Sequence, residues 1–212
     1  MNAVASLYYP VVVAAILWLL ILGVGGIFLG AQPARSKLFG AGVVAFALCF
    51  VPIGGLPLWR LGFGLWPNPS LPLVGLMIAT LSARVAGRTL FTAMDRESIW
   101  FFGAVAGSIL YLHNVVPLGA DFYYWGWDSR VMPIGVGLVA VGLLRAGYRL
   151  GALLLLAMIA FAAGALESTN LWDYVVDPVY WLISLGVVTK RAIGAWKRRR
   201  SPSGDIGTAD RS

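Results

Sequence analysis

Long hydrophobic runs alternate along this chain with short polar, glycine-rich or proline-containing segments. Runs of about 18 or more apolar residues are typical of helices that cross a membrane. The pattern therefore predicts an all-α fold, an integral membrane bundle of seven transmembrane helices. The seven expected helices are residues 8–30, 38–59, 66–83, 99–118, 131–144, 150–166 and 171–190.

The seventh run has two possible starts. After Pro178, only a short apolar stretch remains before Lys190, too short to cross about 30 Å of hydrocarbon at about 1.5 Å per residue. A helix that begins at Leu171 is long enough, but it includes Asp173 and Asp177. Either the two aspartates lie in the outer part of the spanning helix, or the helix is short and the bilayer thins around it.

Proline and glycine interrupt the chain between the second and third runs. Residues 52–72 are either an interfacial loop or the wall of a wet vestibule, since irregular backbone at membrane depth needs protein or water as a hydrogen-bond partner. The single cysteine, Cys49, excludes an intramolecular disulfide and is expected to pack inside the bundle. Gly26 and Gly30, and again Gly103 and Gly107, have a spacing that favours close approach of two helices.

The composition agrees with a membrane protein. Of the 212 residues, 59% are hydrophobic and 12% are charged, whereas soluble domains carry roughly 25% charged residues. We expect one membrane domain at 1–190 and a basic, then disordered, cytoplasmic tail at 191–212. The first run is longer than a signal-peptide core and no Lys or Arg precedes it, so we expect a retained helix.

The positive charge follows the loops. The chain has 16 Lys and Arg and a net charge of +7. Arg60 and Arg130 lie in loops on one side, and the rest lie on the other side, in 31–37, 84–98, 145–149 and the tail. The positive-inside rule then places the C-terminus in the cytoplasm and the N-terminus outside the inner or plasma membrane. Orientation explains the charge, so the expected partner is the lipid bilayer and not nucleic acid.

This orientation brings polar residues to the outer ends of the runs. The expected cluster consists of Arg60, His113, Asn114, Asp128, Arg130, Trp172, Asp173 and Asp177. Charges near hydrocarbon are costly unless they are paired, hydrated or bound to an ion, so we expect Asp173 to hydrogen-bond to another charged or polar member. Asp173 and Asp177 are four residues apart, which on one helix face would favour a bound cation, an arginine or a proton.

Each of these residues also has a simpler interpretation. Asp177 before Pro178 fits a helix N-cap. His113 suits a proton carrier, a metal ligand or a pigment ligand, but a lone His beside Asn114 is more often a hydrogen-bonded interface residue. The aromatic run at 122–127 suits stacking on a flat ligand or contact with a partner protein, although most such residues form an interfacial belt. No metal or cofactor is assigned.

Familiar enzyme motifs are absent from the sequence, including G-x-S-x-G, H-E-x-x-H and a phosphate-binding glycine loop. We therefore expect a protein that binds or transports a small cation or polar solute at the outer acidic and aromatic site. The short fifth and seventh runs favour such a site. Two alternatives remain. One is an accessory subunit that docks a larger membrane complex through its outer aromatic loops, and the other is a membrane enzyme that uses Asp or Glu on a lipid-linked substrate.

Overall fold

The computed structural model describes residues 3–24, 34–112, 121–128 and 130–200, which are mostly helical. The helices are α1 (Ala3–Val24), α3 (Arg35–Cys49), α4 (Leu58–Leu65), α5 (Leu71–Ala86), α6 (Ala93–Leu112), α7 (Trp125–Asp128), α8 (Val131–Arg145), α9 (Leu150–Ala162), α10 (Leu171–Val175) and α11 (Pro178–Arg200). The strands β1 (Pro52–Ile53) and β2 (Leu56–Pro57) form one short antiparallel hairpin. The predicted all-α class is confirmed.

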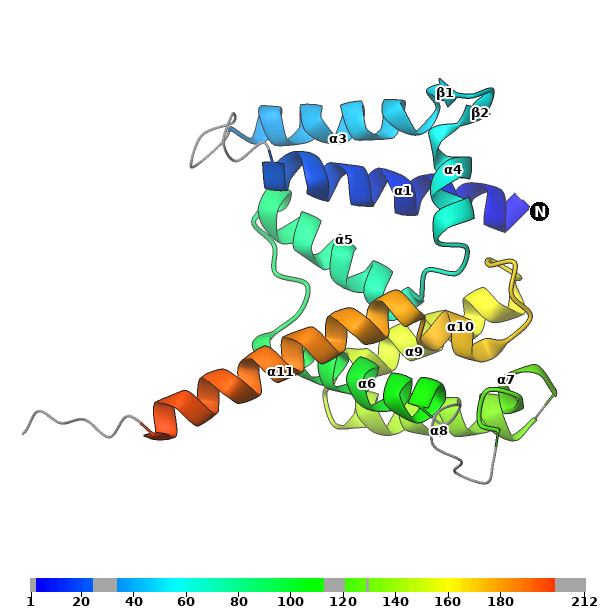
Figure 1. Ribbon diagram of the computed structural model, residues 1–212, viewed down its shortest axis with the longest axis vertical. Helices are drawn as coiled ribbons and strands as arrows, with labels where there is room; N and C mark the ends of the chain where they lie inside the picture. The colour runs from blue at the N-terminus through cyan, green and yellow to red at the C-terminus, as the bar shows by residue number, and fades with distance from the viewer. Residues whose placement is uncertain (1–2, 25–33, 113–120, 129, 201–212) are drawn as a thin grey trace, which may run out of the picture.

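Each hydrophobic run overlaps one long helix, and successive long helices run back and forth (Figure 1). Seven membrane crossings stay a prediction, because Ala3–Gly23 is the one described helix long and apolar enough to cross a membrane by itself. A single helix of this kind near an N-terminus also occurs as a signal sequence or as a soluble core helix. Leu71–Ala86, Val131–Arg145 and Leu150–Ala162 are shorter apolar helices.

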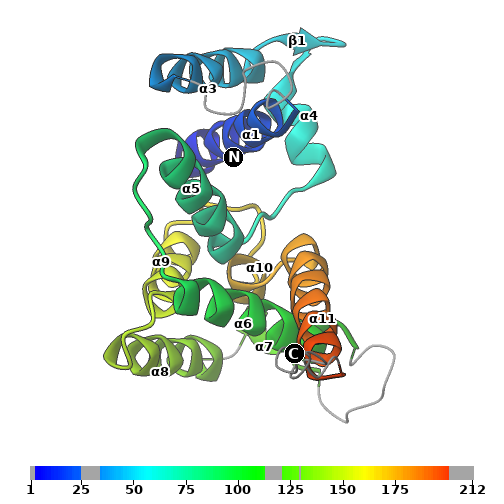
Figure 2. The same ribbon diagram turned by 90° about the vertical axis from the view of Figure 1, so that its left-hand side faces the viewer.

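The helices form two groups that meet at α5 (Figure 2). One group contains α1, α3 and α4, and a small core between α1, α3 and α5 includes Leu22, Leu38 and Leu81. The other contains α6 to α11 around the larger core. Tyr174 and Tyr180, from α10 and α11, are fully buried in that core. Side chains of α10 and α11 therefore form part of the centre of the larger core.

The second run ends earlier than predicted. We expected a helix over 38–59, but α3 ends at Cys49 and the chain turns through the β1–β2 hairpin into α4. The cause is local chemistry, since proline lacks the N–H that continues a helix. Gly54 and Gly55 have φ values of 60° and 85°, as a two-residue hairpin turn requires. Cys49 is buried, in agreement with a packing role.

The seventh run is broken. Of the two possible starts, the structure has the later one at Pro178, so Asp173 and Asp177 do not share one helix face. α10 ends at Val175, and Val176 is extended, with φ −146° and ψ 117°. Asp177 then precedes a new helix, α11, which continues through residue 200 and so includes the first part of the expected tail. The two carboxylates therefore have separate surroundings.

Close packing of α6 against α11 uses one of the two glycine pairs that the spacing singled out; the other, Gly26 and Gly30, lies outside the described residues. A Cβ on Gly103 would lie 2.4 Å from Ser184 Oγ, and one on Gly107 would lie 2.4 Å from a Trp181 ring carbon. Both distances are shorter than real Cβ contacts, so only glycine permits this approach. The small-residue spacing on α6 thus marks a true helix interface.

Candidate functional site

The chain between α9 and α11 is the best-anchored irregular segment at one end of the bundle. We call this end, which includes α4, α7 and α10, the α10 end. Tyr174 Oη accepts a hydrogen bond from the Leu166 amide (3.0 Å), and Tyr9 Oη accepts one from the Glu167 amide (3.2 Å). The Tyr9 hydroxyl also donates to the Pro67 carbonyl (2.7 Å). Aromatic hydroxyls thus satisfy a backbone that has no helix to satisfy it.

Asp177 is a structural carboxylate. It is fully buried. Its Oδ1 accepts from the amides of Val179 (2.8 Å) and Tyr180 (3.0 Å), the geometry of a helix N-cap, and from Trp66 Nε1 (3.2 Å). Its Oδ2 accepts from the Ser70 amide (2.9 Å). The capping interpretation holds, and the same side chain ties the loop before α5 to the start of α11.

The start of α10 is fixed by Asn170. Its Oδ1 caps the helix by accepting from the Trp172 amide (2.9 Å), and its Nδ2 donates to the Tyr123 carbonyl (3.0 Å). The indole of Trp172 donates to the Phe122 carbonyl (2.8 Å). α7 lies so close that a Cβ on Gly126 would come within 1.8 Å of Asn170 Oδ1. Side chains at the start of α10 therefore hold the backbone of the aromatic run (residues 122–127) in place.

Asp173 differs from Asp177 in its surroundings. It is partly buried, and its Oδ1 accepts a hydrogen bond from the Tyr123 hydroxyl (3.0 Å). The Ser168 side chain also hydrogen-bonds to Asp173, and Asp177 adds negative charge nearby. Burial, followed by the charge of Asp173, raises the pKa of Tyr123, so the tyrosine hydroxyl stays neutral and can donate to the carboxylate.

The other members of the expected cluster lie apart or outside the description. Arg60 on α4 is exposed and lies over its neighbour Trp59, 5.7 Å from the ring centre. Arg130 is exposed at the start of α8. Among the described side chains, neither arginine forms an ion pair with Asp173 or with Asp177. Asp128 ends α7, but its side chain, His113 and Asn114 lie outside the described residues.

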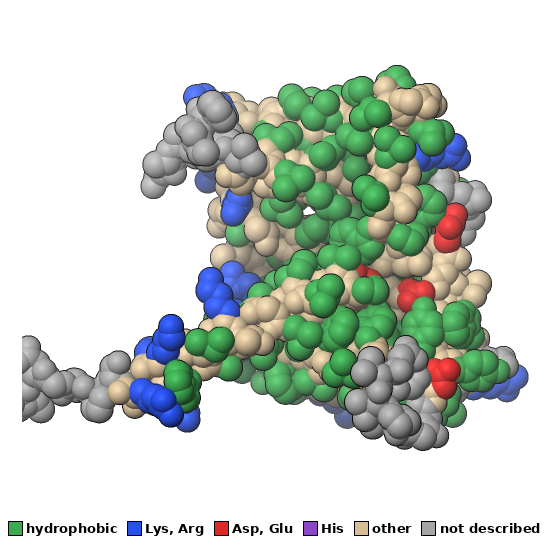
Figure 3. Space-filling model, in the orientation of Figure 1, with side chains coloured by type: hydrophobic (Ala, Val, Ile, Leu, Met, Phe, Trp, Pro, Cys, Tyr) green, Lys and Arg blue, Asp and Glu red, His purple; other side chains and the backbone are tan. Residues whose placement is uncertain are grey.

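A buried carboxylate also joins helices at the opposite end. Asp95 accepts from the Thr92 amide (2.9 Å), the Thr92 hydroxyl (2.9 Å) and the Arg149 amide (2.9 Å), and Arg149 Nε lies 4.0 Å away. The Arg149 guanidinium donates to the Leu90 carbonyl. Thr92 Oγ1 in turn accepts from the Asp95 amide (3.1 Å), so Thr92 and Asp95 form a capping box at the start of α6. Asp95 also holds the start of α9 through the Arg149 amide. On the face in Figure 3, most Lys and Arg gather at this end.

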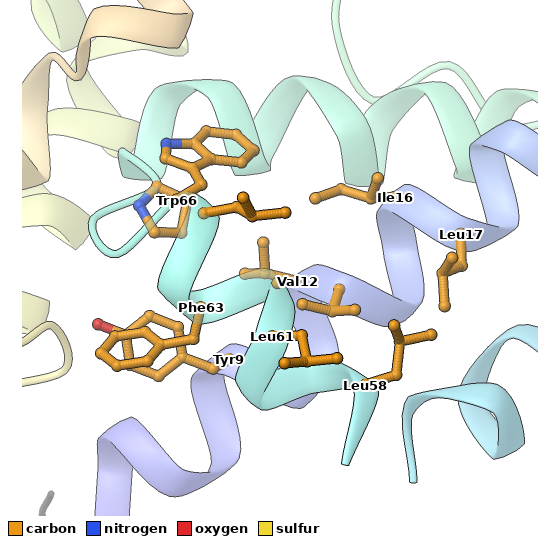
Figure 4. Close-up of a pocket in the computed structure, with 12 residues that line it drawn as sticks. Tyr9, Val12, Ile16, Leu17, Leu58, Leu61, Phe63 and Trp66 are labelled. Atoms are coloured by element: carbon orange, nitrogen blue, oxygen red, sulfur yellow. The ribbon is translucent and has the colours of Figure 1, made fainter. Parts of the chain in front are cut away.

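Two apolar cavities, each of about 290 Å³, lie near the α10 end. One lies between α1 and α4 (Figure 4). Tyr9 and Phe63 pack edge to face near one end of it, and Trp66 and aliphatic side chains line the rest. The polar side-chain atoms of its lining, in Tyr9 and Trp66, are already hydrogen-bonded. The other lies between α6, α8 and α10 and is lined in part by Trp125 and Trp172.

Sequence reasoning missed the residues that build this end. Tyr123 was considered only as part of the aromatic run, and Asn170 and Tyr174 were not singled out, although Asn before an apolar helix is a known capping signal. Among the described residues, there is no group of three His, Cys, Asp or Glu side chains suited to a metal ion. The arrangement offers one carboxylate with capacity for a ligand, Asp173, beside a tyrosine hydroxyl.

Comparison of the chain with protein-family models, with curated proteins and with solved structures finds no match.

Proposed function

We propose that this chain spans a membrane seven times, with its N-terminus outside and its C-terminus in the cytoplasm. Large apolar side chains that point outward from five different long helices support this. Leu7, Phe39, Phe101, Leu138 and Ile159 are each more than 60% exposed. Water-soluble monomers rarely expose contiguous apolar surface beyond a few hundred Å². Lipid tails would cover such surface without cost.

The short helices are compatible with this proposal. α9 has 13 residues, or about 20 Å, against about 30 Å of hydrocarbon. Irregular backbone is tolerated at membrane depth when protein satisfies its polar groups. The segment after α9 meets this condition through Tyr9, Asn170 and Tyr174. We therefore assign the sixth crossing to α9 together with this buried segment.

Reporter fusions test the topology. A reporter that is active only in the cytoplasm should be active when fused after Arg200 and silent when fused after Ser129. This follows from the concentration of Lys and Arg at one end. The reverse pattern would overturn the orientation, and activity at both positions would overturn the spanning arrangement itself.

We further propose that Asp173 binds a small cation or a polar solute from the outer side. The observation that carries this is a partly buried carboxylate whose described hydrogen-bond partners, Tyr123 and Ser168, are both neutral hydroxyls. Removing a carboxylate from water is costly without a compensating cation or hydrogen bonds. A cationic or hydroxyl-bearing solute would offset that cost. Asp177 adds negative charge nearby, but its oxygens already accept four hydrogen bonds.

Binding and flux measurements test this role. Purified protein in lipid vesicles is titrated with alkali cations, small amines and sugars, and uptake is followed in parallel. Asp173→Asn should weaken binding of the active solute by about tenfold or more, since losing a partly desolvated charge partner costs more than 1.4 kcal/mol. Glu167→Gln, at an exposed loop position, is the control. Equal binding by both variants would exclude Asp173 as the site.

Exposed aromatic residues favour a second candidate function. Tyr124 and Trp127, in and beside α7, are each at least half exposed although the run is firmly bound to α10. A rigid aromatic surface also suits an accessory subunit that contacts a larger membrane complex. Purification in mild detergent tests this, because a stoichiometric partner would support the subunit and a monomer would not.

A further inference from the structure

The second half of α11 extends past the rest of the bundle. Arg191 still contacts α6, since its guanidinium lies 3.8 Å from the Glu97 carboxylate. The helix then continues to Arg200, and residues 192–200 add about 14 Å of length. In Figure 1 this orange to red end projects away from the other helices. We call residues 192–200 the α11 extension.

The α11 extension is strongly basic. Its last turn consists of Lys197, Arg198, Arg199 and Arg200, all of them exposed. The extension has no Asp or Glu of its own, and Figure 3 shows Lys and Arg side chains gathered over this projecting end. Adjacent like charges repel each other, and a negatively charged partner relieves that repulsion. The last turn of α11 therefore favours an anionic partner.

Two apolar side chains lie among these charges. Ile193 and Trp196 are 48% and 50% exposed, and their three-residue spacing places them on one helix face. Lys197 follows Ile193 by four positions and Arg200 follows Trp196 by four, so cations flank the apolar pair. The Arg200 guanidinium lies over the Trp196 ring, 4.0 Å from its centre. An exposed indole flanked by cations is typical of the boundary between lipid headgroups and acyl chains.

The position of Trp196 along α11 fits this boundary. Under the proposed topology, the ion pair between Arg191 and Glu97 lies at the cytoplasmic end of the bundle. Trp196 is five residues farther along, or about 8 Å. The headgroup layer on each side of a bilayer is about 5–8 Å thick. A helix that leaves the bundle at an angle (Figure 1) keeps the indole at the level of this layer.

The first half of α11 indicates that the anionic partner is lipid. Leu182 and Ile183 are 60% and 43% exposed, so the same helix presents apolar side chains outward before its basic end begins. Under the proposed topology these side chains face hydrocarbon. A nucleic acid offers phosphates to the last turn, but it offers nothing to the apolar surface that continues along the helix. A lipid provides both.

We propose that the α11 extension binds anionic lipid headgroups at the cytoplasmic surface of the membrane. Ile193 and Trp196 enter the boundary with the acyl chains, and the four cations of the last turn pair with headgroup phosphates. Guanidinium groups suit this role because their paired N–H donors match the oxygens of a phosphate. This inference rests on the proposed membrane topology and is independent of the role of Asp173.

The experiment measures which lipid lies next to Trp196. Full-length protein is placed in phosphatidylcholine nanodiscs that contain a minor fraction of lipid brominated near the top of its acyl chains. The brominated lipid is either phosphatidylglycerol, which is anionic, or phosphatidylcholine, at the same fraction. The difference between the wild-type protein and Trp196→Phe gives the fluorescence of Trp196 alone. We expect the anionic lipid to quench this fluorescence about twofold or more strongly, because each Lys or Arg near the surface attracts anionic lipid.

A variant of the last turn tests the source of this preference. Replacement of its four cations by Gln should equalise the quenching by the two lipids. The matched control replaces the same number of exposed cations elsewhere at the basic end, and it should keep the preference; its substitutions are Arg35→Gln, Lys37→Gln, Arg84→Gln and Arg88→Gln. The ratio between the two lipids is compared, so a change in the brightness of the indole cancels. Loss of the preference in the control as well would overturn the assignment to the α11 extension.

Salt provides a second measurement that needs no change in the last turn. Raising the salt from about 0.1 M to about 1 M shortens the Debye length from about 10 Å to about 3 Å. The excess quenching by phosphatidylglycerol should then fall by about half or more, whereas quenching by phosphatidylcholine should stay the same. A preference for phosphatidylglycerol that salt does not reduce would contradict a headgroup site made of Lys and Arg.

The outcomes separate this proposal from the membrane topology. If both brominated lipids quench Trp196 equally, the α11 extension does not select anionic lipid, and the topology stands. If neither lipid quenches any tryptophan of the chain, the bilayer does not surround the bundle and both proposals fail. If a single-stranded RNA oligonucleotide changes the fluorescence of Trp196 and anionic lipid does not, the extension is a nucleic-acid surface and the lipid proposal is wrong.

Discussion

Asp173 and Asp177 are four residues apart, yet the structure uses them differently. Asp177 is fully buried and accepts hydrogen bonds from three backbone amides and one indole. Asp173 is partly buried, and its described hydrogen bonds come from two side-chain hydroxyls, those of Tyr123 and Ser168. Backbone amides cannot move away from their carboxylate without unfolding, whereas a tyrosine hydroxyl can rotate. The number of backbone donors therefore separates a structural carboxylate from one that can take a ligand.

Asp95, the buried carboxylate at the end opposite the α10 end, is also held by backbone donors. Asp95 accepts from the amides of Thr92 and Arg149 and so joins α6 to α9. Asp95 and Asp177 are both structural carboxylates, because each connects by hydrogen bonds two segments that are distant in sequence. Asp173 is the exception among the carboxylates described in the bundle interior, which is why the proposed function rests on it.

The largest loss of stability should come from replacing Asp177. Asp177→Ala leaves the donors of Trp66, Ser70, Val179 and Tyr180 without their acceptor. Each buried donor left unsatisfied costs about 1–3 kcal/mol, so we expect a loss of roughly 3–5 kcal/mol in the free energy of unfolding. The thermal unfolding midpoint in mild detergent measures this. Glu167→Ala, at an exposed position, should be nearly neutral.

If Asp177→Ala unfolds no more easily than Glu167→Ala, the distinction between the two aspartates collapses. Asp177 would then be as available for a ligand as Asp173, and the original expectation of a paired acidic site would return.

A smaller effect is expected from the contact that holds Tyr123 beside Asp173. Gly126→Ala would place a Cβ within 1.8 Å of Asn170 Oδ1, and overpacking of this kind costs about 1–3 kcal/mol. The shift should also weaken solute binding at Asp173, because α7 carries the neighbouring tyrosine with it. Gly135→Ala, where a Cβ meets nothing within 4 Å, is the control. Unchanged stability in Gly126→Ala would show that α7 is not fixed to α10.

Much of the fold follows from local sequence pattern. The seven apolar runs predicted where the long helices lie, because helix formation there depends on nearby residues. The breaks were harder to predict. Gly54 and Gly55 indicate a turn. Whether residues 38–59 form one helix, or a helix followed by a hairpin, depends on Pro52. The break between α10 and α11 depends on capping by Asn170 and Asp177 together.

The candidate site was predicted less well for a physical reason. Opposite charges were expected to meet, but Arg60 and Arg130 are exposed, and the described partners of Asp173 are the hydroxyls of Tyr123 and Ser168. Tyrosine hydroxyls have no periodic pattern in a sequence, and the segments they join are up to 158 residues apart, as in the bond between Tyr9 and Glu167. Long-range contacts of this kind require the folded chain.

The smallest effect on stability, and the one with the opposite sign, should come from Asp173. Asp173 is partly buried, and removing its charged carboxylate from water costs free energy on folding. Protonation at low pH removes this cost. Asp173→Asn keeps an acceptor for Tyr123 but carries no charge. Without ligand at pH 7 it should be more stable than the wild-type protein by about 0.5 kcal/mol, within the range of partly exposed substitutions. Unfolding midpoints measured from pH 7 down to pH 3.5 should show this difference shrinking toward zero.

If Asp173→Asn is less stable than the wild-type protein at pH 7, Asp173 is a structural carboxylate like Asp95 and Asp177. The contrast between Asp173 and Asp177 would then be lost.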